Sequence, residues 1–211
     1  RVVRQRNTLL KTRAPENSLA LWTEQLISLG AQLTAERILL VEKLNPYVTA
    51  HYAKLNEVKA ASIAYKSSTD GLTTDTDSNI AILTEQQKEV AYKESERGVS
   101  LIGPHRDDLH LHLGDFPAKG YASHGESWSM AIALRIGSFT LLRDEGSSPI
   151  LILDDIFAEL DTARRAQLVA ITHLAEQTFI TAAVESDLPA DLLTQRFYVT
   201  PGKVSSEAGV L

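Results

Sequence analysis

The sequence predicts an α/β fold with parallel strands, joined to a smaller helical part. Two apolar segments, 150–153 and 178–184, have the length and composition of strands that are buried in a parallel sheet. A helical pattern over 160–176 lies between them, and strand, helix and strand with short connections form a βαβ unit. Most of the first sixty residues, by contrast, follow a helical period.

The first long helix is predicted from Leu19 to Leu44. Apolar residues recur along it at helical spacing, and Asn17 or Ser18 is a suitable N-cap just before it. Pro46 lacks a backbone N–H, so we expect it to kink this helix or to restart it.

Three further segments complete the helical part. Residues 58–66 favour a short strand, and the polar segment 67–78 (SSTDGLTTDTDS) is rich in turn formers and predicts a flexible loop. A second helix is predicted over 79–97, ended by Gly98. The sequence therefore predicts a helical arm subdomain over 1–98, with a flexible loop at 67–78.

A second domain is predicted over 99–211. It begins with a strand at 108–113, in which leucines alternate with histidines and place the leucines on one face. A long apolar helix is predicted over 126–143, before the βαβ unit.

Composition limits the function classes. The chain has 211 residues, 44% of them apolar, no cysteine and a net charge of −6. No apolar run approaches the roughly 20 residues that a membrane helix needs, so we expect no membrane association. The missing cysteines exclude disulfides and thiolate metal sites, and a cytoplasmic location is expected. The acidic balance argues against a constitutive nucleic-acid binder.

Positive charge nevertheless gathers at the start of the chain. Two interpretations stay open: a solvated helix face, or an edge that contacts phosphates. The basic residues concerned, with no acid among them, are Arg1, Arg4, Arg6, Lys11 and Arg13.

Two adjacent carboxylates follow the first apolar strand of the βαβ unit. Asp154 and Asp155 stand at its C-terminal end, where α/β sheets bind ligands. In P-loop ATPases the first such acid serves the Mg²⁺ shell and the second orients the attacking water. Asp161 follows six residues later, as a helix N-cap or as the acid of a D-loop. The alternative for the pair is a strand that ends in a polar turn.

The segment Ser123–His124–Gly125–Glu126 stands before the long apolar helix. Ser123 and Glu126 have the spacing of a capping box, which is a sufficient structural explanation. A serine hydroxyl, a glycine N–H and a positive helix end also form an anion site. In an ABC-type dimer such a signature motif holds the γ-phosphate of nucleotide bound to the opposite subunit.

The order of these motifs decides between the alternatives. Signature, helix, Walker B strand and D-loop follow one another as in the C-terminal lobe of an ABC/SMC-type ATPase head. No G-x-x-x-x-G-K-[ST] occurs in the sequence, so the loop that holds the nucleotide phosphates, the Walker A motif, is missing. We therefore expect a C-terminal half that does not hydrolyse ATP by itself, since a complete head carries this loop upstream.

Three segments resemble one family of such proteins. The segment Gly103–Pro104–His105–Arg106–Asp107–Asp108–Leu109, the signature, and the run from Leu153 to Asp161 are similar to the RecF family of bacterial DNA replication and repair proteins. The resemblance extends from the N-terminal RQRNTLLK to about Leu188.

The resemblance implies a function. RecF-like proteins dimerise on ATP, bind double-stranded DNA near gaps, and act with RecR and RecO to load RecA in recombination repair and the SOS response. It also implies roles for individual residues. Ser123, His124, Gly125, Glu126 and Asp161 would bind nucleotide, Asp154 would serve Mg²⁺, and Asp155 would be catalytic.

Some features depart from the pattern or stay open. Ser127–Trp128 stands where the family signature commonly has Gln–Arg, and no histidine follows the strand at 178–184 to act as a switch. Thr181 or Glu185 is a possible substitute. The roles of His105 and Arg106 stay open, and one structural interpretation is that Arg106 pairs with Asp107 or Asp108. Two other functions stay open: the nucleotide-binding subunit of an ABC transporter, and a bare protein-interaction module.

Overall fold

The computed structural model of the chain describes residues 1–206 except 57, 159, 190–191 and 193–194. The chain forms two compact units, Arg1–Glu145 and Gly146–Leu211. Within the described part, no helix combines the length and the apolar composition that crossing a membrane requires.

The first unit is built on one long helix, α2 (Glu16–Leu55), which extends for about 60 Å at 1.5 Å per residue. It begins earlier than predicted, after Pro15, so Asn17 and Ser18 lie inside its first turn and neither is the N-cap. Pro46 lies inside the helix without ending it. Pro46 has no N–H to donate to the carbonyl four residues earlier in the helix. Because Pro46 is exposed, that carbonyl can bond to water instead.

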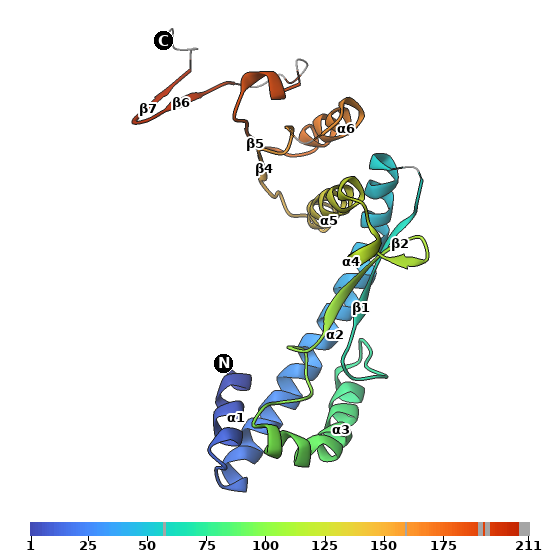
Figure 1. Cartoon of the computed structure of the whole chain (residues 1–211), viewed down its shortest axis with the longest axis vertical. Helices are drawn as coiled ribbons and strands as arrows, with labels where there is room; N and C mark the ends of the chain where they lie inside the picture. Colours follow the sequence, from blue (N-terminus) through green and yellow to red (C-terminus); the bar gives the residue numbers. More distant parts are fainter. Residues whose placement is uncertain (57, 159, 190–191, 193–194, 207–211) are drawn as a thin grey trace. The chain divides into compact units, whose positions relative to one another are not determined.

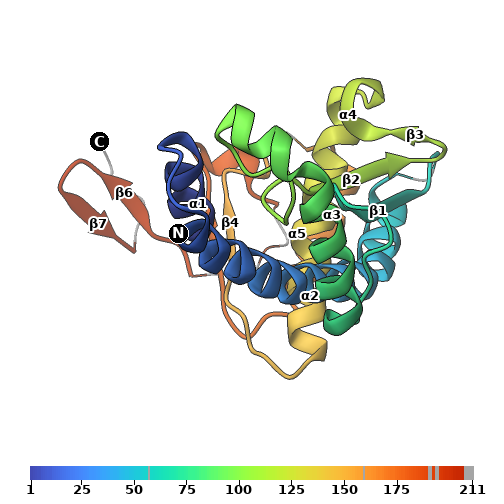
Figure 2. The same cartoon turned by 90° about the horizontal axis from the view of Figure 1, so that it is seen from below.

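Two other helices pack on the N-terminal half of α2: α1 (Val2–Lys11) and α3 (Thr76–Arg97) (Figures 1 and 2). The apolar contact between α2 and α3 is formed by the buried side chains of Ile27 and Ala31 of α2 and Leu83 of α3, together with Ile102 from the segment after α3. The helix predicted over 79–97 begins three residues earlier, because Asp75 is its cap and accepts a hydrogen bond from the Ser78 N–H at 3.2 Å. Gly98, with φ 66°, ends it as predicted.

A small antiparallel sheet lies beside the rest of α2. It is formed by β1 (Ala61–Lys66), β2 (Asp108–Leu113) and the short β3 (Phe116–Pro117), in that order. The leucine face predicted for β2 becomes buried only gradually, from Leu109, which is 38% exposed, to Leu113, which is 3% exposed. After the short α4 (Ala118–Tyr121) comes α5 (His124–Asp144).

Helix α5 packs closely on the C-terminal half of α2. At Gly137 a Cβ atom would come within 3.2 Å of the Val48 backbone nitrogen, so the missing side chain permits the approach. Together with the pairing of β1 and β2, this contact places residues 99–145 in the same compact unit as the helices before them. The compact units thus divide at 145/146 rather than at 98/99. The functional division into an arm over 1–98 and a lobe over 99–211 stays a prediction.

The second unit contains the predicted βαβ arrangement. Strands β4 (Leu151–Asp154) and β5 (Thr178–Thr181) are parallel, with Leu153 opposite Ile180, and α6 (Thr162–Thr172) connects them. A 3₁₀ turn (Glu185–Asp187) and a hairpin of β6 (Tyr198–Thr200) and β7 (Lys203–Ser205) follow.

One face of β4 and β5 is not covered in this unit. Leu153 is buried, but Ile152 is 68% exposed and Phe179 is 51% exposed. The prediction that both strands are fully buried is therefore wrong for the described residues, because alternate side chains of a strand point to opposite faces and only one face is packed here. An uncovered apolar face of this kind is typical of a surface that packs against further protein.

Candidate nucleotide-binding site

The signature segment forms the first turn of α5. Ser123 is the N-cap: its Oγ accepts a hydrogen bond from the Glu126 N–H at 3.3 Å, and the Ser123 N–H donates to Glu126 Oε2 at 2.8 Å. The predicted capping box is therefore confirmed. Ser123 and His124 are exposed and Gly125 is half-buried, so this turn faces solvent.

Lys59 supports this turn from another segment of the chain. Its Nζ lies 2.7 Å from Glu126 Oε1. The hydrogen bond from Lys59, with those from Ser123, lowers the pKa of Glu126 from 4.5 to about 2. Glu126 is thus a carboxylate at neutral pH and keeps its hydrogen bond from the Ser123 N–H in the capping box. The sequence had no local signal for this ion pair, because 67 positions separate its partners.

The turn can bind an anion. The N–H groups of the first helical turn have no carbonyl partners within α5, and the positive end of the helix dipole lies there. The Ser123 hydroxyl accepts one bond from the Glu126 amide and keeps its own proton to donate. A phosphate oxygen is a suitable acceptor for these donors.

The acid pair in the second unit is organised by Thr181. The Thr181 hydroxyl donates to Asp154 Oδ1, while the Asp155 N–H donates to Thr181 Oγ1 at 3.0 Å and to the Thr181 carbonyl at 3.2 Å. Asp155 adopts a left-handed conformation, with φ 50°, which turns the chain sharply at the strand end. One threonine on β5 therefore fixes both acids.

These acids have the chemistry of a magnesium site. Mg²⁺ in nucleotide sites takes one or two carboxylates and completes its shell with phosphate oxygens and water. Asp154 is exposed at the end of a parallel strand, which fits this role. Among the described residues, no group of three or more His, Cys, Asp or Glu side chains could hold a metal ion by itself.

Asp161 is the N-cap of α6, as predicted. Its Oδ1 accepts from the Arg164 N–H at 2.9 Å, and its Oδ2 lies 2.7 Å from Arg164 Nη1. The structural interpretation of Asp161 is therefore confirmed, and its D-loop role stays a prediction.

Two residues are possible substitutes for the switch histidine, Thr181 and Glu185, and they differ in their contacts. Thr181 contacts both acids directly, as described above. Glu185 instead forms an ion pair with Arg196. This difference favours Thr181 as the side chain that acts beside the acids.

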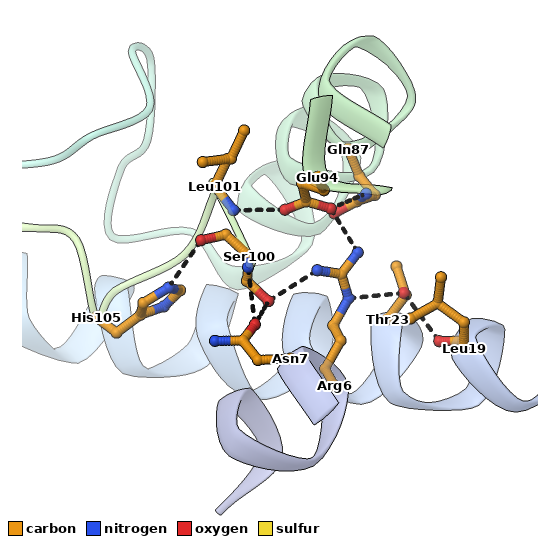
Figure 3. A network of polar contacts seen from close by, with 9 residues as sticks. All are labelled: Arg6, Asn7, Leu19, Thr23, Gln87, Glu94, Ser100, Leu101 and His105. Atoms are coloured by element: carbon orange, nitrogen blue, oxygen red, sulfur yellow. Dashed lines mark hydrogen bonds and ion pairs between the residues drawn. The ribbon is translucent and has the colours of Figure 1, made fainter. Parts of the chain in front are cut away.

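The basic N-terminal segment does not behave as one surface. Arg6 is only 1% exposed and forms an ion pair with Glu94 at 2.6 Å (Figure 3). Its guanidinium also donates to Ser100 Oγ at 2.8 Å and to Thr23 Oγ1 at 2.9 Å. Arg6 is thus neither part of a solvated face nor free for phosphate. Four other basic residues of the segment are exposed: Arg1, Arg4, Lys11 and Arg13.

In the segment 103–108 (GPHRDD), Asp107 forms the hydrogen bonds that hold neighbouring segments together. It accepts hydrogen bonds from the Tyr65 hydroxyl at 2.5 Å and from the Ser68 N–H at 2.8 Å, which anchors the start of the 67–78 loop. Burial and the hydrogen bond from its hydroxyl to Asp107 raise the pKa of Tyr65. Arg106 is exposed and forms no ion pair with Asp107 or Asp108 among the described residues, so the interpretation that it pairs with one of them is wrong.

Three known proteins with similar sequences carry the same name. The chain is 44% identical to the DNA replication and repair protein RecF of Streptomyces avermitilis, 42% to that of Beutenbergia cavernae and 41% to that of an Arthrobacter species. Each match covers 97% of this chain and 58–60% of the relative. No family model matches the chain.

Solved structures agree on the fold. Two structures of the recombination mediator protein RecF, one described with ATP and one with ATPrS, superpose with TM-scores of 0.83 and 0.81 at 24% identity. They cover 98% and 96% of this chain, which itself spans 56% and 55% of theirs. This confirms the predicted α/β fold, and by its sequence the chain belongs to the RecF family of DNA replication and repair proteins.

Proposed function

We propose that this chain supplies the signature, Walker B and D-loop residues of an ATP-gated DNA clamp that acts in recombination repair. The observation that carries the proposal is the solvent-facing signature turn, in which Ser123 and Glu126 are locked together and Lys59 fixes Glu126. A capped helix end that is rigid and open is suited to close on phosphates that a second subunit presents.

The roles divide between the two units. Ser123, His124 and Gly125 meet the nucleotide of the partner subunit, and Glu126 holds their turn in shape. Asp154 serves Mg²⁺, Asp155 orients the attacking water, and Asp161 is the D-loop acid. When bound, Mg²⁺ supplies charge neutralisation at the phosphates. The Thr181 hydroxyl holds the Asp154 carboxylate and the backbone N–H of Asp155 in place.

Gating by ATP follows from the charge balance. A chain with a net charge of −6 lacks a large permanent attraction for DNA. Closure of a homodimer brings the exposed basic residues of two subunits together, so DNA affinity depends on nucleotide. The expected ligands and partners are double-stranded or gapped DNA, RecR and RecO, with RecA as the protein finally loaded, in the cytoplasm.

Two observations bear on the alternative functions, a transporter subunit and a bare interaction module. The curated relatives are DNA replication and repair proteins, which favours this function over that of a transporter subunit. No phosphate loop occurs in the 211 residues, so the chain alone is expected to hydrolyse no ATP. A bare interaction module would also be inactive alone, and only an assay with the phosphate loop present separates the two.

The test therefore uses a completed protein, in which a segment that carries a G-x-x-x-x-G-K-[ST] phosphate loop is fused ahead of Arg1. Binding to gapped duplex DNA is measured with and without ATP. Ser123→Arg puts a bulky cation into the signature turn and should remove the ATP-dependent increase in affinity. Ala131→Arg, at an exposed position of the same helix outside the signature, is the matched control.

ATP-dependent binding that Ser123→Arg alone abolishes supports the clamp. Equal binding with and without ATP, or a Ser123→Arg protein that behaves like the unsubstituted one, would show that Ser123 is only a helix cap.

A further inference from the structure

Two aromatic side chains stack on each other in solvent, just before the signature turn. The ring centroids of Phe116 and Tyr121 are 5.5 Å apart, with 27° between the ring planes. The two residues are 58% and 66% exposed. A stacked pair that is not covered by the rest of its own unit presents an aromatic face to a flat ligand.

The fold holds this pair in a fixed place. Phe116 lies in β3, opposite Leu113 of β2, after a turn at Gly114 with φ 59°. Tyr121 ends α4, where the Ala122 N–H donates to the Ala118 carbonyl at 2.9 Å. The stacking therefore joins the end of a hairpin to the segment that leads into the signature.

The aromatic pair and the signature turn share a support. Lys59 lines a shallow hollow of about 110 Å³ together with Leu113, Phe116, Tyr121 and Ala122. The same lysine holds Glu126, which in turn holds the Ser123 N–H. The hollow is too small for a nucleotide, so a ligand would lie on the ring faces rather than enter it.

We propose that Phe116 and Tyr121 stack against the base of the nucleoside triphosphate whose phosphates meet the Ser123 turn. Tyr121 stands two residues before Ser123, a span of at most about 7 Å. A nucleoside triphosphate is longer than this, so one molecule can reach both. The aromatic pair would then give the signature side of the site a contact with the base in addition to its contact with phosphate. This inference rests on the proposed function, because it needs nucleotide from a partner subunit.

The exposed faces favour a nucleotide over duplex DNA. Bases in a duplex are stacked on one another and offer no free face, whereas the base of ATP does. Single-stranded DNA also offers free faces, and the test includes it.

The experiment uses the completed protein and follows nucleotide-dependent dimerisation by analytical ultracentrifugation. ATP is compared with ribose 5-triphosphate, which lacks only the base. Stacking of a base on one aromatic side chain contributes to the free energy of binding. Tyr121→Ala should therefore raise the ATP concentration for half-dimerisation about 5- to 100-fold. Tyr121→Phe, which keeps the ring, should stay close to the unsubstituted protein. Tyr92→Ala removes an aromatic ring that is 73% exposed on α3 and is the matched control.

A second measurement separates stacking from a structural effect. The triphosphate of 2-aminopurine riboside loses fluorescence when its base stacks. Dimerisation should therefore quench it in the unsubstituted protein and in Tyr121→Phe, and much less in Tyr121→Ala, which keeps only the Phe116 ring. Ribose 5-triphosphate should act equally on all three proteins.

The outcomes are distinguishable. If Ser123→Arg abolishes dimerisation while Tyr121→Ala changes neither the ATP dependence nor the quenching, the stacking inference is wrong and the clamp stands. Dimerisation that responds to neither substitution overturns the proposed function. If Tyr121→Ala weakens only the binding of single-stranded DNA, the rings contact DNA and not nucleotide.

Discussion

The Arg6 guanidinium lies 2.6 Å from the Glu94 carboxylate, and both side chains are almost completely buried, at 1% and 0% exposure. Glu94 also accepts hydrogen bonds from Gln87 Nε2 and from the Leu101 N–H, so three residues donate to this buried carboxylate (Figure 3). This ion pair connects α1 with α3 across 88 positions of the chain and fixes the N-terminal end of the helical unit.

Removing one partner of this pair should strongly destabilise the first unit. Arg6→Met leaves the Glu94 carboxylate buried and uncompensated, which costs about 3–5 kcal/mol. The free energy of unfolding, measured by urea denaturation, should fall by that amount. Arg4→Met, at an exposed position of the same helix, should change it by less than about 0.5 kcal/mol. A loss of under about 1 kcal/mol for Arg6→Met would mean that the pair is not buried in solution.

The capping box should respond to acid. The pKa of Glu126 is lowered from 4.5 to about 2, so its stabilising effect is complete above pH 4.5 and is lost as the pH falls towards 2. Glu126→Gln should therefore lower Tm at neutral pH, and the difference from the unsubstituted protein should shrink within that window. Glu145→Gln is the control, since the Lys43–Glu145 pair is about half exposed on both sides. A difference in Tm that is constant down to pH 2 would contradict the role of the charge.

His51 should make stability depend on pH in a higher range. Its Nε2 lies 3.0 Å from Thr140 Oγ1 between α2 and α5, and burial, with the charges of Lys54 and Arg143, lowers its pKa below 6.5. The unfolded chain thus takes up a proton near pH 6.5 that the folded chain resists, and stability falls as the pH drops below 6.5.

The substitution His51→Gln should remove that part of the pH dependence. Tm measured between about pH 7.5 and pH 5 checks this, with His173→Gln at an exposed position as the control. If both variants keep the pH profile of the unsubstituted protein, another group is responsible.

Thr181 should act on catalysis through the two acids that it holds. In the completed protein, Thr181→Val removes the hydroxyl that bonds to Asp154 and to the Asp155 N–H, and kcat for ATP hydrolysis should fall about tenfold. KM should change less than kcat, because the signature turn binds the phosphates without this hydroxyl. Thr181→Ser should restore the rate, and Thr200→Val, at an exposed position of β6, should have no effect. An unchanged kcat for Thr181→Val would exclude the positioning role.

Much of the candidate site was predictable because its signals are local. Ser123 and Glu126 are three residues apart, and Asp161 caps the helix that begins at the next residue, so each hydrogen bond forms between neighbours in the chain. The position of Asp154 and Asp155 at a strand end likewise follows from one apolar run. The functional roles of these residues stay predictions.

The sequence by itself therefore determined the α/β class, the βαβ unit and the caps, since period, turn formers and capping residues act within a few positions. Only the tertiary structure decided that Arg6 is buried, that Lys59 fixes Glu126, and that α5 packs on α2. The physical reason is that these contacts join segments far apart in the chain. Which partner a charge meets, or which face of β4 stays uncovered, depends on the packing of whole elements and leaves no trace in the local pattern.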